Sequence, residues 1–170
     1  VVVLGGGTGG YVAAIRAAKA GLKTAVVEKE KLGGTCLHKG CIPTKSLLKS
    51  AEMYKEAQQL EQYGVYVKEV TYNFKEMLIR KQSIVDTLHG GVKSLLKNAG
   101  VDVYKGTGTI LGPSIFSPLP GTISVVNGEE EPSMLIPTTC IIATGSRPRA
   151  LSFFPFNGDK VMNSDDMRQL

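Results

Sequence analysis

The sequence predicts an α/β fold in which a parallel sheet and long helices carry a small antiparallel β-meander. Three observations support this prediction. An apolar, β-branched run at residues 1–4 precedes a glycine-rich turn and an alanine-rich helix. Two long stretches with apolar residues at helical spacing come next. Short β-type runs punctuated by glycine and proline then occupy residues 106–137, before a strand-like apolar run returns at residues 139–143.

The first element is Val1–Leu4, a short apolar run typical of a buried parallel strand. Gly5, Gly7 and Gly10 follow it directly in a GxGxxG spacing, and residues 11–20 form the alanine-rich helix. Glycines let the chain turn tightly, and they let backbone N–H groups approach a pyrophosphate at the helix N-terminus. The segment therefore has the order of elements that a phosphate-binding turn requires.

The second strand is Thr24–Val27, and Glu28 stands at its end. An acidic side chain at that position can accept hydrogen bonds from the hydroxyl groups of a ribose. Strand, glycine turn, helix and distal acid together predict a Rossmann-like dinucleotide-binding unit. The alternative is a glycine-rich turn of some other α/β unit.

Two cysteines, Cys36 and Cys41, follow the dinucleotide motif closely. Their sulfur atoms can meet only if the backbone bends between them, and Gly40 is free to take an unusual φ. Ile42-Pro43 starts a long amphipathic stretch, because proline suits a first helical turn, and we expect this helix to end near residues 62–64. Cys41 is therefore expected near a helix N-terminus, where the helix dipole stabilises a thiolate.

Lys39 and Lys45 add positive charge near this pair, which suits it to thiol–disulfide exchange. Three other interpretations stay open. The two cysteines could form a purely structural disulfide, or Cys36, His38 and Cys41 could ligate zinc, although a closed structural site needs four ligands. They could also be inert buried thiols, although the glycines and lysines around them would make a poor apolar core.

A second long helix is expected from about Asn73 to Asn98, because apolar residues keep helical spacing over that length. Gly90 and Gly91 interrupt the pattern, and a close packing contact would explain two glycines there. Val101–Tyr104 then resumes the sheet.

Residues 106–137 consist of short runs typical of β-strands, and Asn127-Gly128 is a dipeptide that favours the turn of a β-hairpin. We predict a three-stranded antiparallel insertion there. Thr139–Ala143 returns to a buried parallel strand, and residues 144–148 turn sharply from its C-terminal end, where doubly wound sheets bind their ligands. Cys140 lies inside that strand and is interpreted as a core thiol.

Three runs resemble signatures of one family. GGTCLHKGCIPTK (residues 33–45) resembles the redox-active signature of the pyridine nucleotide–disulfide oxidoreductases. GGGTGGYVAAIRAA (residues 5–18) and ATGSRPR (residues 143–149) resemble the flavin-binding elements of that family. The resemblance covers essentially the whole chain but only the N-terminal, flavin-binding part of the family architecture. Thr8 and Thr44 stand where proline and serine are common in relatives.

The resemblance implies FAD as the cofactor and a Rossmann-like FAD-binding domain. Leu37, Ile42 and the Thr44-Lys45 ending favour the branch of the family that oxidises dihydrolipoamide with NAD. The alternatives are a glutathione- or mercuric-reductase-like member and a noncatalytic FAD-binding module.

The resemblance also implies roles for individual residues. Cys36 would be the interchange thiol, Cys41 the thiolate lying against the flavin, and Lys45 a positive charge near flavin N5. No metal ligands are predicted. The residues expected at FAD are Gly5, Gly7, Thr8, Gly9, Gly10, Glu28, Lys29, Gly34, Thr35, Cys36, Cys41, Lys45, Gly108, Ala143, Thr144 and Gly145.

The reaction also needs a general base and an NAD site, and both are expected outside these 170 residues. His38 and His89 stand in no recognisable base motif, so the general base would come from the C-terminal interface domain of the other subunit of a homodimer. The NAD site is also expected elsewhere. We therefore predict a flavin-domain fragment: residues 1–148 bind FAD, with the insertion at about 106–137, and residues 149–170 form a linker towards an NAD-binding domain. The expected partner is the lipoyl-bearing acyltransferase of a 2-oxo acid dehydrogenase complex.

Composition limits the other function classes. The formal net charge is +5, but lysines alternate with acidic residues along both helices and only 6% of residues are aromatic, so no nucleic-acid-binding stripe is expected. No apolar stretch approaches the length that crosses a bilayer, so no membrane association is predicted either. We expect a cytoplasmic location, or the mitochondrial matrix in a eukaryote.

Overall fold

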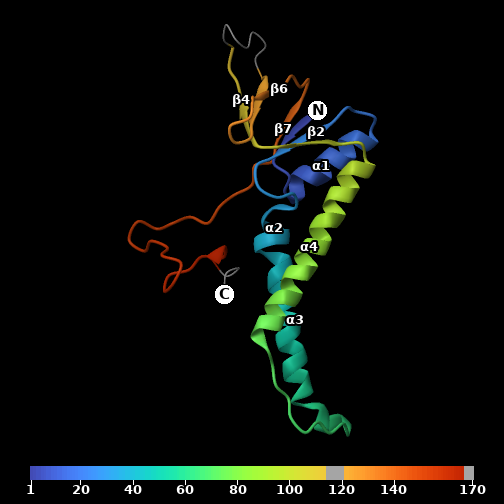
Figure 1. Ribbon diagram of the computed structural model, residues 1–170, viewed down its shortest axis with the longest axis vertical. Coiled ribbons are helices and arrows are strands. Elements are labelled where there is room, and N and C mark those ends of the chain that lie inside the picture. Colours follow the sequence, from blue (N-terminus) through green and yellow to red (C-terminus); the bar gives the residue numbers. More distant parts are fainter. Residues whose placement is uncertain (114–120, 167–170) are drawn as a thin grey trace. The chain divides into compact units, whose positions relative to one another are not determined.

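The computed structural model describes residues 1–113 and 121–166 (Figure 1). Two compact units make up the chain. Unit 1 comprises Val1–Thr35 and His89–Arg149, and unit 2 comprises Cys36–Leu88 and Ala150–Leu170. The predicted division into an FAD-binding domain at residues 1–148 and a linker at 149–170 stays a prediction.

Unit 1 contains a four-stranded parallel sheet in the order β3-β2-β1-β7. Val2 pairs with Ala25 on one side and with Cys140 on the other, and Val3 and Val26 at the centre of the sheet have no exposed surface. This confirms the predicted parallel sheet. The strands are β1 (Val2–Leu4), β2 (Ala25–Glu28), β3 (Asp102–Lys105) and β7 (Cys140–Ile142).

Helix α1 (Thr8–Lys19) connects β1 to β2 and contacts both strands (Figure 1). Ala14 is completely buried on the helix, where its small side chain permits close packing. Gly21 ends the connection with φ +84°, as a glycine after a helix commonly does. The predicted strand, glycine turn, helix and strand are therefore present in that order.

The predicted insertion is an antiparallel sheet in the order β4-β5-β6. Its strands are β4 (Thr107–Ile110), β5 (Ile123–Val126) and β6 (Ser133–Leu135). Ile123 and Val125 are buried in one cluster with Leu4 and Val27 of the parallel sheet, so the two sheets of unit 1 share a core. The Pro-Leu-Pro run at residues 118–120, one of the predicted breaks between strands, lies outside the described residues.

Unit 2 contains α3 (Cys41–Ala57), the 3₁₀ turn η1 (Leu60–Tyr63) and the first part of α4 (Phe74–Asn98), and α3 and α4 run side by side (Figure 1). The Arg80 guanidinium on α4 donates hydrogen bonds to the carbonyl oxygen and the Oγ of Ser46 on α3, at 3.2 and 3.1 Å. Nearer the end of the hairpin, the rings of Tyr54 and Tyr72 meet edge to face with centroids 5.3 Å apart.

Three details of this unit and of the adjoining helices differ from the predictions. A short helix, α2 (Gly34–Lys39), precedes α3 and was not anticipated, and α3 ends at Ala57 rather than near residue 62. Gly90 and Gly91 have open space where a Cβ would lie, so a close contact with described residues does not explain them.

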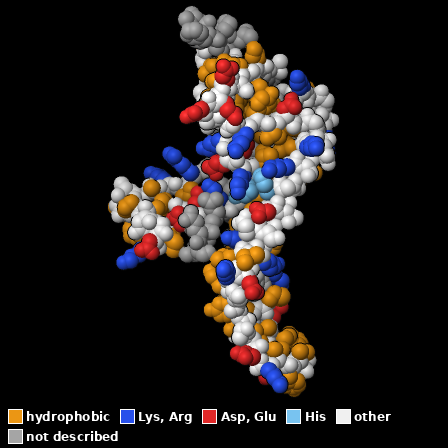
Figure 2. All heavy atoms as spheres, in the orientation of Figure 1, with side chains coloured by type: hydrophobic (Ala, Val, Ile, Leu, Met, Phe, Trp, Pro, Cys, Tyr) orange, Lys and Arg blue, Asp and Glu red, His pale blue; other side chains and the backbone are white. Residues whose placement is uncertain are grey.

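Figure 2 shows hydrophobic side chains gathered at the end of this hairpin. Tyr63, Val65, Tyr66 and Val67 are all exposed there, Tyr66 by 80%. Among the described residues, no helix combines the length and the apolar character needed to cross a membrane.

Candidate functional site

In the glycine turn after β1, two glycines stand where a side chain with a Cβ would collide with the backbone. Gly5 takes φ +102°, and a Cβ on it would collide with the carbonyl oxygen of Ala143. A Cβ on Gly10 would collide with the carbonyl oxygen of Gly5. These contacts hold the start of α1 against the ends of β1 and β7. In this motif the first glycine permits the tight turn and the third permits close packing of helix and strand.

The turn is open at Gly7, Thr8 and Gly9. A Cβ on Gly7 would meet only the Cα of Gly34, at 3.7 Å, and one on Gly9 would meet no described atom within 4 Å. Thr8 and Gly9 are exposed, and the first turn of α1 carries no acidic residue. The first N–H groups of a helix have no partner within it, so they are available to an anion. The turn therefore fits a pyrophosphate group.

Glu28 is held beside this turn by backbone N–H groups. Its carboxylate accepts a hydrogen bond from the N–H of Gly6 and another from the N–H of Glu30, both at 2.7 Å. Each oxygen of a carboxylate has a second lone pair, so the group still has capacity for hydroxyl donors. The structure thus gives Glu28 a role in fixing the turn, in addition to the predicted role at a ribose.

The chain leading into α2 packs directly on the same turn. Gly33 and Gly34 take φ +110° and +64°, and the N–H of Gly33 donates to the carbonyl oxygen of Gly6 at 2.8 Å. A Cβ on Gly34 would lie 2.7 Å from the Cα of Gly7. Gly6 and Gly33 were absent from the predicted site. The runs of consecutive glycines at residues 5–7 and 33–34 were a usable signal for this backbone contact.

The other predicted cofactor residues of unit 1 lie in different settings. Ala143 follows β7 and donates its N–H to the carbonyl oxygen of Leu4 at 2.8 Å. Thr144 and Gly145 come next and are exposed, as are Lys29 and Thr35. The roles predicted for these residues at FAD stay predictions.

Gly108 is accounted for by packing. A Cβ on it would lie 2.6 Å from Cδ2 of Leu4 and 3.1 Å from Cγ1 of Val27, so β4 approaches the parallel sheet closely there. This contact explains the glycine without a ligand, and its predicted contact with FAD stays a prediction.

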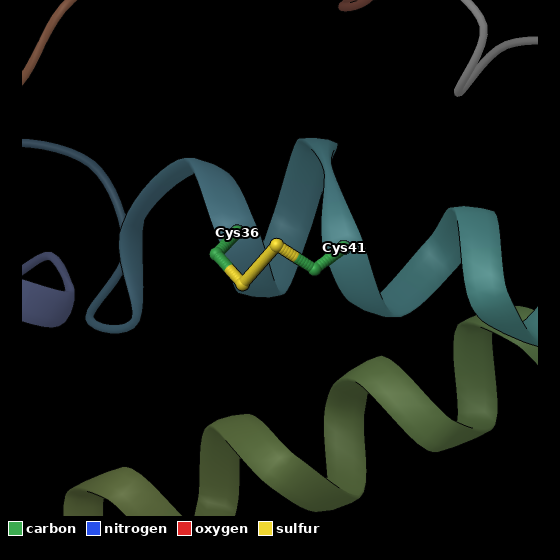
Figure 3. Close-up of a disulfide and its surroundings, with 2 residues drawn as sticks. All are labelled: Cys36 and Cys41. Atoms are coloured by element: carbon green, nitrogen blue, oxygen red, sulfur yellow. A yellow bond between two sulfur atoms is a disulfide. The ribbon is translucent and has the colours of Figure 1, made fainter.

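Unit 2 contains the two cysteines of the signature, and the structure joins them in a disulfide (Figure 3). Cys36 comes from α2 and Cys41 is the first residue of α3, with Cα atoms 4.7 Å apart. The break between the two helices makes the bend. Gly40 at that break has φ −135° and ψ −107°, which is neither helical nor extended, so the bend uses no positive φ.

Cys41 is exposed at the N-terminus of a 17-residue helix, as predicted, and Cys36 is half-buried. Lys45 lies one turn along α3 and is also exposed. The ammonium group of Lys39 is 3.3 Å from a carboxylate oxygen of Asp165, so that ion pair offsets its charge. Of the two lysines expected to favour a thiolate, Lys45 is therefore the one outside this ion pair.

His89 and Cys140, the other candidate residues, have structural roles. Nδ1 of His89 lies 2.9 Å from the carbonyl oxygen of Leu32, a structural hydrogen bond within unit 1. Within residues 1–113 and 121–166, no group of three His, Cys, Asp or Glu side chains could hold a metal ion. Cys140 packs against the buried cluster of the sheet, and burial raises the pKa of its thiol, which suits the core role predicted for it.

Comparisons with known proteins agree on one family. The family model described as pyridine nucleotide-disulphide oxidoreductase matches residues 1–169. The chain is 63% identical over 171 residues to dihydrolipoyl dehydrogenase of Bacillus subtilis, covering 100% of this chain and 36% of that protein. It is 44% identical over 167 residues to dihydrolipoyl dehydrogenase of Trypanosoma brucei brucei, covering 96% of this chain and 33% of that protein.

Two solved structures share the fold. The chain matches LpdA from Mycobacterium tuberculosis with a TM-score of 0.86 at 22% identity, covering 99% of this chain and 36% of that one. It matches the HOCl-induced flavoprotein disulfide reductase RclA from Escherichia coli, solved as a Cu(II) complex, with a TM-score of 0.73 at 24% identity, covering 99% of this chain and 34% of that one. The chain spans about a third of the length of the curated relatives it matches.

Proposed function

Since the chain belongs to the pyridine nucleotide–disulphide oxidoreductase family, we propose that the whole protein is an FAD-dependent enzyme that oxidises dihydrolipoamide with NAD. The observation that carries the proposal is the Cys36–Cys41 disulfide at the start of α3, in a chain whose first strand is followed by a glycine turn suited to a dinucleotide. The choice of dihydrolipoamide follows the names of the curated relatives.

The residues of unit 1 fit FAD on structural grounds. Gly5 and Gly10 stand where a Cβ would collide with backbone, and Gly7 and Gly9 leave the mouth of the turn open. We assign the pyrophosphate to this turn and the ribose hydroxyl groups to Glu28. When bound, FAD supplies a two-electron acceptor for the protein dithiol.

The chemistry of the chain itself is thiol–disulfide exchange. A thiolate of dihydrolipoamide attacks Sγ of Cys36, the bond between Cys36 and Cys41 breaks, and Cys41 leaves as a thiolate. The second thiol of the substrate then attacks the mixed disulfide and releases Cys36. Lipoamide leaves as a cyclic disulfide, and the protein holds the two electrons as a dithiol.

Two groups of the chain stabilise the thiolate that forms on Cys41. The N-terminus of α3 presents unpaired N–H groups and the positive end of the helix dipole. Lys45, one turn further along the same helix, adds a full positive charge. We assign the general base, the NAD site and the second subunit of a homodimer to parts of the protein beyond these residues.

The same proposal includes the setting of the enzyme. Its partner is the lipoyl-bearing acyltransferase of a 2-oxo acid dehydrogenase complex, because that subunit presents dihydrolipoyl groups for reoxidation. Its location is the cytoplasm, or the mitochondrial matrix in a eukaryote.

The test is the full-length protein with Cys36→Ser, assayed for NADH formation from dihydrolipoamide. We expect the rate to fall by about a thousandfold or more, because no mixed disulfide can form. Reduction of an artificial quinone by NADH, which bypasses the dithiol, should persist and so shows that the variant folds and holds FAD. Dihydrolipoamide oxidation at the wild-type rate in this variant would refute the proposal, and efficient reduction of glutathione disulfide or mercuric ion would place the enzyme in another branch.

A further inference from the structure

The loop between β2 and α2 lies directly against the glycine turn of unit 1. The N–H of Gly33 donates to the carbonyl oxygen of Gly6 at 2.8 Å. A Cβ on Gly6 would lie 2.6 Å from Cδ2 of Leu32, so the buried side chain of Leu32 packs on the turn. A Cβ on Gly34 would likewise lie 2.7 Å from Cα of Gly7. These three consecutive loop residues therefore form one wall of the turn that we assign to the pyrophosphate.

A histidine on α4 holds this loop from the side. Nδ1 of His89 lies 2.9 Å from the carbonyl oxygen of Leu32, which is 57 residues away in the sequence. A carbonyl oxygen can only accept a hydrogen bond, so Nδ1 carries a proton and donates it. The bond therefore fixes Leu32, the residue directly before Gly33, whose own N–H binds the turn.

The place of His89 on α4 is one where the sequence pattern favours an apolar residue. His89, Val92 and Leu96 follow one another at helical spacing, and Val92 and Leu96 are buried. A leucine at residue 89 would continue this apolar stripe. The histidine is half-buried there and places a hydrogen-bond donor on the stripe instead. Its bond to the loop is the contact that a leucine could not make.

We propose that His89 is a positioning residue for FAD. It acts through Leu32 and Gly33: by holding the loop, it keeps the wall of the glycine turn in the shape that accepts the pyrophosphate. A ligand binds more tightly to a site that is already formed, because less conformational entropy is lost on binding. This inference rests on the proposed function, in which the glycine turn holds the pyrophosphate of FAD.

The experiment measures how tightly the full-length holoenzyme holds FAD. Wild-type protein and His89→Leu are diluted in series, and the flavin released into an ultrafiltrate is measured by its absorbance. The variant keeps the apolar stripe but removes the donor, and we expect the Kd for FAD to rise by about fivefold, as the loss of one net hydrogen bond would give. Hydrogen–deuterium exchange of residues 29–35 in the holoenzyme should become faster in the same variant, because the N–H of Gly33 is less firmly held.

Three further variants separate positioning from a general loss of stability. His89→Asn places an amide nitrogen where Nδ1 stands and should restore the affinity for FAD. His89→Gln places its amide further from the backbone, near the place of Nε2, and should not restore it. The matched control is Val92→Ala, which removes buried apolar packing on the same helix. It should lower the melting temperature and leave the Kd for FAD unchanged.

The outcomes distinguish this inference from the proposed function. Equal retention of FAD by wild type and His89→Leu would overturn the inference and leave the proposed function intact. An equal rise in Kd for Val92→Ala would also overturn it, because loss of stability would then explain the effect. If His89→Leu does not fold, His89→Asn and His89→Gln give the same comparison, and equal Kd values for these two would contradict a role for a donor at Nδ1. A wild-type protein that held no FAD would refute the proposed function and this inference with it.

Discussion

The glycine turn of unit 1 and the helical hairpin of unit 2 are held in place by different means. In the turn, backbone meets backbone: Gly5 against Ala143, Gly10 against Gly5, and Gly34 against Gly7. In the hairpin, the contacts between α3 and α4 are made by side chains, such as Arg80 on Ser46 and Tyr54 on Tyr72. A backbone contact tolerates no added atom, whereas a side-chain contact can rearrange.

The two regions also differ in what they leave exposed. The turn leaves N–H groups open to an anion, while the hairpin leaves large apolar side chains open, including Tyr63 and Tyr66 at its end. All the contacts that shape the turn therefore come from residues of unit 1. The hairpin provides a redox pair on a scaffold whose apolar surface remains available to other groups.

The sharpest test of this contrast is Gly10→Ala, with Gly9→Ala as its control. The new Cβ of Gly10→Ala collides with a backbone carbonyl oxygen that cannot move without separating α1 from β1. We expect a loss of about 3 kcal/mol or more of unfolding free energy, or failure to fold. Gly9→Ala places its Cβ in open space and should change stability little. Urea unfolding followed by circular dichroism measures both, and equal stability of the two variants would contradict the steric interpretation.

A smaller effect is expected from Arg80→Met in the hairpin. The variant keeps most of the apolar length of the side chain but loses both hydrogen bonds to Ser46, which is buried. We expect a loss of about 1–2 kcal/mol, because a net hydrogen bond is worth about 1 kcal/mol and Ser46 can turn its hydroxyl to a carbonyl of its own helix. The control is Lys75→Met, an exposed position on the same helix. If the two variants unfolded at the same denaturant midpoint, the hydrogen bonds between Arg80 and Ser46 would have no energetic role.

The smallest effect, opposite in sign, is expected from Gly91→Ala on α4. No described atom lies within 4 Å of its Cβ position, so the substitution meets no obstacle there. Alanine is favoured over glycine in a helix by about 1 kcal/mol, and we expect stability to rise by up to that amount. A thermal melt that showed destabilisation instead would mean that a group outside the described residues packs on this glycine.

Most strands and helices could be predicted because they depend on residues close together in the sequence. The four parallel strands, the three-stranded insertion and the long helix beginning near Asn73 all follow from hydrophobic periodicity and turn residues, which act over a few positions. The same reasoning missed α2, because Gly33-Gly34 and the residues after it lack a helical apolar stripe. It also placed the end of α3 too late, because the pattern continues into η1 although the backbone tightens there.

The functional groups were evident from the residue pattern: a glycine turn that suits a dinucleotide, two cysteines at a helix start, and an acid at the end of the second strand. Which of these groups are in contact depends on how the chain folds. Gly34 packs on Gly7, and Glu28 holds Gly6. Lys81 on α4 is only 6% exposed, although a lysine in a helical pattern predicts an exposed position. The reason is physical: periodicity reports which face of an element is apolar, whereas collisions and burial depend on residues far apart in the chain.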